Sequence, residues 1–268
     1  MLLPRAVNET MNALDAMTLW APTLLLVTVR VAGMVAFAPV FGHSAVPVPV
    51  RVLVSVAMGL AVVSRLAGPV AVPDRALELI AAVGGEFLIG AAIGYAARMI
   101  FTGVELGAFH VSTQMGLSMA DVIDPSRSDA PGATVGLYRM LAVVVFLAVG
   151  GHRALVGGLM GTFQSVPPLR LASVGGLLDM VVAMLAASFV LALKLAAPVL
   201  VAMLLATVAL GLLHRTLPQL NLLSIGLPVR VLVGLVLVAA SLAAVGPLVD
   251  VAVTQLGRNI QALTVVAR

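Results

Sequence analysis

The sequence contains no cysteine and only one lysine. Charged and aromatic side chains make up just 10% and 4% of its 268 residues. Without cysteine there is no disulfide framework, no thiol nucleophile and no cysteine-based metal site. The positive charge comes from scattered arginines, which argues against a surface for nucleic acid. In contrast, 62% of the residues are hydrophobic and the mean hydropathy is +1.17. Soluble domains are about 45–50% apolar, so we predict an integral membrane protein or the apolar core of a membrane-embedded complex.

Six apolar segments are separated by connections rich in proline and glycine, which predicts an all-α, polytopic architecture of kinked helices and hairpins. A spanning helix needs about 20 residues, so the second segment is short and the fifth is too long for one span. Pro198 predicts a kink in the fifth segment. We expect no signal peptide, and an amphipathic tail from Asp250 to Arg268. The segments are Met17–Phe41, Val50–Val63, Leu77–Ile100, Met140–Phe163, Leu177–Leu213 and Pro228–Val249.

Membrane topology is not encoded in the usual way, because arginines occur in both sets of loops rather than in excess on one side. Either the protein is weakly biased, or its helices do not all cross a bilayer in the ordinary manner. Glycine pairs with GxxxG spacing predict close packing between helices. These pairs are Gly90 and Gly94, Gly103 and Gly107, Gly132 and Gly136, and Gly157 and Gly161.

Five ionisable side chains interrupt the apolar segments: Arg30, Glu86, His152, Arg153 and Lys194. Each costs about 2.5–3.5 kcal/mol at the centre of a membrane helix on insertion scales. We therefore predict that they are buried against protein, a wet lumen or one another. The sequence leaves two interpretations open, satisfied pairs within a helical bundle or a direct role in transport, and it does not assign the pairs.

The stretch Gly103–Pro125, GVELGAFHVSTQMGLSMADVIDP, is too polar to face lipid and too apolar for open water. It mixes glycine and methionine with Glu105, His110 and Gln114. Such a segment is expected to line or plug something inside a protein assembly. Flexible methionine side chains adapt to irregular gaps, which suits a seal. An ordinary buried turn is the alternative.

Enzyme chemistry finds little support. The sequence has no phosphate-binding GxxxxGK[ST] loop, no HExxH and no GxSxG motif. Its four histidines lack metal-ligand spacing, and the aspartates at 121, 124 and 129 fit turn and cap chemistry better than a cation site. We predict no catalytic, cofactor or metal site.

Several motifs in order resemble the FliR family of type III secretion export gates. The central stretch Gln114–Ser118 with Asp124-Pro125 carries the strongest resemblance. Glu86–Gly90 followed by Gly94 resembles a second family pattern. A C-terminal block resembles a third, and it comprises Ala209–Leu213, Arg215, Pro218–Asn221, Gly226 and Pro228.

This resemblance implies one copy of the chain assembled with several FliP and FliQ subunits in the bacterial inner membrane, at the flagellar basal body. FlhA and FlhB would complete the apparatus, which exports unfolded flagellar proteins. It also implies one integral membrane domain, with residues 1–180 FliP-like and 181–268 a FliQ-like hairpin. A pore plug is implied in the central stretch, formed by Phe109, Gln114, Met115, Gly116, Leu117, Ser118, Met119 and Ala120.

Three alternatives remain open at this point. Injectisome export-gate subunits of the SctT and SpaR type share some of the motifs, although the wording of the motifs favours the flagellar branch. A small-solute transporter would also suit buried charges and a broken helix. A polytopic membrane enzyme is the third, and it lacks a catalytic constellation.

Overall fold

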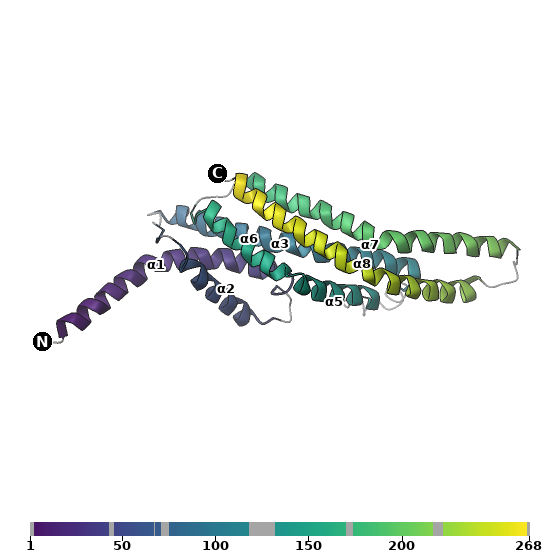
Figure 1. The fold of residues 1–268 in the computed structure, drawn as a ribbon, viewed down its shortest axis with the longest axis horizontal. Helices are drawn as coiled ribbons and strands as arrows, with labels where there is room; N and C mark the ends of the chain where they lie inside the picture. The colour runs from purple at the N-terminus through teal and green to yellow at the C-terminus, as the bar shows by residue number, and fades with distance from the viewer. Residues whose placement is uncertain are drawn as a thin grey trace. The chain divides into compact units, whose positions relative to one another are not determined.

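The computed structural model describes residues 3–42, 46–66, 68–70, 75–117, 132–169, 174–216 and 222–266. Within these ranges side chains are described from residue 18 to residue 263, except at 174, 214 and 222–225. The described part of the chain is helical and contains no strand (Figure 1). The helices are α1 (Leu3–Phe37), α2 (Val48–Val63), α3 (Ala76–Met115), α5 (Ala133–Ala148), α6 (Gly151–Ser165), α7 (Val174–Thr216) and α8 (Leu222–Val266).

The polytopic membrane architecture predicted from composition is confirmed. Among the described residues, four helices are long and apolar enough to cross a membrane, over residues 18–37, 76–115, 175–213 and 226–263. The bent pair α5 and α6 would make a fifth crossing if the two helices act as one span. The short apolar helix α2 has 16 residues, which agrees with the short second segment of the sequence.

The helix boundaries differ from the sequence segments in several places, and α1 already begins at Leu3 rather than at Met17. Helix α3 continues beyond Ile100 to Met115, so half of the unusual central stretch is helical. Helix α7 is one helix of 43 residues with Pro198 inside it, and the kink expected at Pro198 stays a prediction. The tail after Asp250 is helical as a continuation of α8 rather than as a separate element.

The fourth apolar segment is not one helix, because it breaks between α5 and α6 with a bend of 59°. Gly150 adopts φ +82° at the break, a left-handed conformation that glycine reaches without steric cost. The next residue, Gly151, lies against the ring of Phe146, where a Cβ would approach Cζ to 2.7 Å. Gly150 therefore suits the backbone of the turn, and Gly151 leaves room for the ring of Phe146.

The chain divides into two compact units, each made from separate stretches of sequence. The first comprises Met1–Arg98, Arg153–Val182 and Gly257–Arg268. In this unit α2 packs on α1, since a Cβ on Gly59 would lie 2.5 Å from Oγ1 of Thr28. The middle of α6 packs near the end of α8, because a Cβ on Gly158 would be 3.0 Å from the Ile260 side chain.

The second unit comprises Met99–His152 and Ala183–Leu256. Here α3 approaches α7 closely at Gly103, whose added Cβ would lie 2.6 Å from the carbonyl oxygen of Ser188. One turn later, a Cβ added to Gly107 would lie 2.9 Å from the carbonyl oxygen of Ala192. The GxxxG prediction is confirmed for this pair. By contrast, an added Cβ on Gly157 or Gly161 meets no described atom within 4 Å.

Candidate functional site

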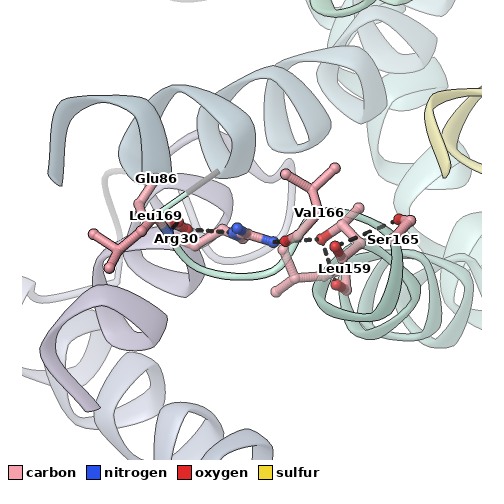
Figure 2. A network of polar contacts seen from close by, with 7 residues as sticks. Arg30, Glu86, Leu159, Ser165, Val166 and Leu169 are labelled. Carbon is pink, nitrogen blue, oxygen red and sulfur yellow. Dashed lines mark hydrogen bonds and ion pairs between the residues drawn. The ribbon is translucent and has the colours of Figure 1, made fainter. Parts of the chain in front are cut away.

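The most polar buried site of the first unit is centred on Arg30 of α1, whose side chain is 0% exposed (Figure 2). Its Nε donates to Oε2 of Glu86 on α3 at 2.5 Å, and Glu86 is only 2% exposed. A charged pair in an apolar helical bundle is tolerated only when both members are paired and hydrogen-bonded. The two charges that interrupt the first and third apolar segments therefore neutralise each other.

Helix α6 and Val166, the residue that follows it, supply further contacts of the guanidinium, whereas its Nη2 is buried without a hydrogen-bond partner among the described residues. Nη1 donates to the backbone carbonyl oxygen of Val166 at 3.0 Å and to Oγ1 of Thr162 at 3.3 Å. The guanidinium carbon lies 4.3 Å from the ring centroid of Phe163, a cation–π distance. Arg30 thus ties three helices together, and we call Arg30, Glu86, Thr162, Phe163 and Val166 the Arg30 cluster.

The second oxygen of Glu86 fixes the connection that follows α6. Oε1 accepts the backbone N–H of Leu169 at 3.1 Å, as Figure 2 shows. Leu169 has φ +76°, an unfavourable conformation for a residue with a side chain. A carboxylate acceptor is one of the stronger partners for a backbone N–H, so Glu86 helps to hold this turn in place.

The approach of α3 to α1 beside the cluster depends on glycine. A Cβ on Gly90 would collide with the carbonyl oxygen of Arg30 and lie 2.9 Å from the backbone N of Met34. One turn later, Gly94 faces the backbone of Met34 and Ala38 in the same way. The spacing predicted close packing at this pair, and the prediction is confirmed. The ion pair is short because no side chain separates the two backbones.

The other ionisable residues picked out by sequence are not among the described contacts of the Arg30 cluster. His152 is half-buried, and its Nδ1 is buried without a hydrogen-bond partner among the described residues. Arg153 and Lys194 are exposed on the single chain. Their burial was predicted for an assembly, and for these two residues it stays a prediction.

The predicted plug residues are only partly described, because Ser118, Met119 and Ala120 lie outside the described residues. Phe109, Gln114 and Leu117 are exposed, whereas Met115 is completely buried in the second unit. The Met115 side chain fills the space above Gly234 of α8, beside Met203 of α7. In this conformation Met115 is packed inside the chain rather than presented to a lumen.

The backbone at Gly116 ends helix α3 in a Schellman motif. The N–H of Leu117 donates to the carbonyl of Ser112 at 3.2 Å, and the N–H of Gly116 donates to that of Thr113 at 3.1 Å. Gly116 has φ +81°, as the motif requires. The helix therefore stops here because glycine follows Met115.

Substitution of Gly116 is expected to weaken this helix end in a graded order. Alanine should cost about 1 kcal/mol because a Cβ strains the left-handed conformation, and valine should cost more. Asparagine, which tolerates this region, should be the mildest. The thermal midpoint of the purified protein or complex measures the order. Equal midpoints for asparagine and valine variants would contradict the motif.

The sequence analysis did not predict two polar contacts that the second unit contains. The hydroxyl of Tyr138 on α5 is hydrogen-bonded to that of Ser241 on α8, and both are buried. Nε of Arg139 lies 3.2 Å from Oε1 of Glu105, in a partly exposed ion pair. A tyrosine or serine within an apolar run signals a need for a partner, but periodicity does not say which helix supplies it.

Comparison with known proteins gives a consistent result. The model of the family described as bacterial export proteins, family 1, matches residues 21–256. The flagellar biosynthetic protein FliR of Bacillus subtilis is 28% identical over 250 residues, covering 91% of this chain and 92% of the relative. FliR of Caulobacter vibrioides is 30% identical, covering 82% and 88%. The Yop proteins translocation protein T of Yersinia pestis is 27% identical over a shorter region, 58% and 60%.

Proposed function

This chain belongs to the FliR family of bacterial export proteins, and on that premise we propose that it is a structural and gating subunit of a protein export gate. It is a membrane component of the flagellar-type export apparatus, and the family is not an enzyme family. The gate would contain FliP-type and FliQ-type subunits with one copy of this chain. It would lie in the bacterial inner membrane at the flagellar basal body, beside FlhA- and FlhB-type components.

The observation that carries the proposal is the family match over residues 21–256. The flagellar system is favoured over the injectisome because the flagellar relatives align over at least four fifths of this chain, against 58% for the Yersinia protein. The surface supports an assembly too. Large apolar side chains such as Leu53, Met140 and Leu205 are exposed on the single chain. Patches of this kind mark membrane or protein contacts.

We further propose that the plug segment, Phe109–Ala120, closes the pore of the gate at rest. The order of residues at the end of α3 supports this proposal. Met115 anchors the segment inside the second unit, Gly116 ends the helix, and the residues that follow would reach the lumen. The exported cargo would be unfolded flagellar proteins, and the proposed hairpin of residues 181–268 would correspond to a FliQ-like portion.

Co-expression tests the proposed function. The chain expressed alone should aggregate or be degraded, because its apolar faces lack their natural neighbours. Expressed with FliP- and FliQ-type subunits of the same organism, it should purify as a discrete complex of defined mass. A stable monomer that carries out saturable solute uptake in liposomes would contradict the proposal and favour a small-solute transporter.

A further inference from the structure

Lys194, the only lysine of the chain, lies at the midpoint of the apolar span 175–213 of α7 and is exposed on the single chain. Each half of this span is about 28 Å of helix, close to the thickness of a hydrocarbon core. In the part of the chain that the structure describes, the Lys194 ammonium forms no ion pair. A counter-charge for Lys194 would therefore have to come from outside these residues.

The surface around Lys194 is apolar. Val190 and Leu193 before Lys194, and Val201 and Leu205 after it, are 51–65% exposed on α7. If lipid covered this face, the ammonium would sit deep in hydrocarbon at a cost of about 2.5–3.5 kcal/mol. If Lys194 instead lay at the membrane surface, one apolar half of the helix would stand in water. Either placement is unfavourable, because it leaves a charge in hydrocarbon or an apolar surface in water, unless another protein covers this face.

Pro198 adds a second polar group at the same position. It is exposed, four residues after Lys194, and proline has no backbone N–H to donate. The carbonyl of Lys194 therefore loses the donor that an ordinary helix provides at that position. An ammonium and an unsupported carbonyl together make the centre of this face a polar spot within an apolar strip. A partner that matches it must be apolar along its length and polar at one point.

We propose that the outer face of α7, defined by Val190, Leu193, Lys194, Val201 and Leu205, docks against an apolar helix of another gate subunit that presents a carboxylate to Lys194. The inference rests on the proposed function, because it needs a multi-subunit assembly. A carboxylate is the partner that neutralises a desolvated ammonium. A buried pair of this kind also fixes the register between two apolar helices, because any shift along the axis separates the charges.

The uniqueness of Lys194 allows a direct test by zero-length cross-linking. The co-purified complex is treated with dicyclohexylcarbodiimide, which activates carboxyl groups in apolar surroundings so that a touching amine forms an amide. Apart from the N-terminus, Lys194 offers the only amine of this chain. Mass spectrometry should find Lys194 joined to an aspartate or glutamate in an apolar helix of a different subunit. Lys194→Arg is the matched control, since it keeps the charge and the assembly but abolishes the amide.

Removal of the charge completes the test. Lys194→Leu should lower the amount of chain in the complex by about tenfold or more, because a buried carboxylate is left unpaired. Arg75→Leu removes a cation from an exposed ion pair at the start of α3 and should leave assembly unchanged.

The outcomes separate this inference from the function on which it rests. An intact complex in which Lys194 forms no amide and Lys194→Leu assembles normally would overturn the docking proposal alone. So would an amide to a carboxylate of this chain or of a second copy. Failure of the wild-type chain to enter a complex would instead contradict the proposed function, and the docking proposal with it.

Discussion

Replacement of Glu86 by leucine is expected to destabilise the protein by about 3–5 kcal/mol, because it leaves the buried Arg30 guanidinium without its counter-charge. The substitution also removes the acceptor for the N–H of Leu169. The measured quantity is the amount of chain recovered in the co-expressed complex, together with the thermal midpoint of that complex. Both should fall sharply relative to wild type.

The chain offers a matched control on the same helix. Glu78 of α3 pairs with Arg75 at 3.5 Å, but the two side chains are 54% and 83% exposed. Glu78→Leu should therefore have little effect, because exposed pairs contribute little. Arg30→Met combined with Glu86→Leu should be less harmful than the sum of the two single changes, since no charge is left unpaired. If Glu86→Leu behaves like Glu78→Leu, the cluster does not stabilise the fold.

Gly90→Ala is expected to have the second large effect, although it adds only one methyl group. The new Cβ would overlap the carbonyl oxygen of Arg30, and neither backbone can move without parting α1 from α3. Overpacking of this kind costs about 1–3 kcal/mol and occasionally more. Because the separation would also stretch the ion pair, we expect a value at the upper end. The thermal midpoint of the complex reports the loss.

Gly84→Ala is the control for this substitution, again on α3. An added Cβ at Gly84 meets no described atom within 4 Å. Since alanine is a better helix former than glycine by about 1 kcal/mol, this variant should be neutral or slightly more stable. A complex that tolerates both alanines equally would show that α1 and α3 do not approach as closely at Gly90 as described.

The sequence was sufficient to predict the membrane class, the family and most helix positions. Apolar runs of about 20 residues fix the helices, because a backbone in hydrocarbon must satisfy its own hydrogen bonds. Close packing at Gly90 and Gly103 followed from GxxxG spacing. The presence of charge at Arg30 and Glu86 was equally visible in the sequence.

The pairing of those charges was not predictable. Arg30 and Glu86 are 56 residues apart, and no periodicity within one helix indicates which other helix supplies a partner. The break at Gly150 was also missed, because the run Met140–Phe163 was interpreted as one apolar segment despite Gly150 and Gly151 within it. Hydropathy does not indicate where the backbone adopts a positive φ. Likewise, Gln114 and Met115 are neighbours in sequence, yet the helix places one outside and the other in the core.

The claim that this chain closes a protein-export pore is tested most directly by the closed-state conductance of the reconstituted complex. The complex with FliP- and FliQ-type subunits is compared with the same complex in which residues 118–120 of this chain are deleted, so that the buried Met115 and the helix end at Gly116 are kept. We predict that the deletion variant still assembles and that its resting conductance rises well above that of wild type, because the seal against ions and water is gone. An assembled deletion variant with unchanged resting conductance would contradict the claim.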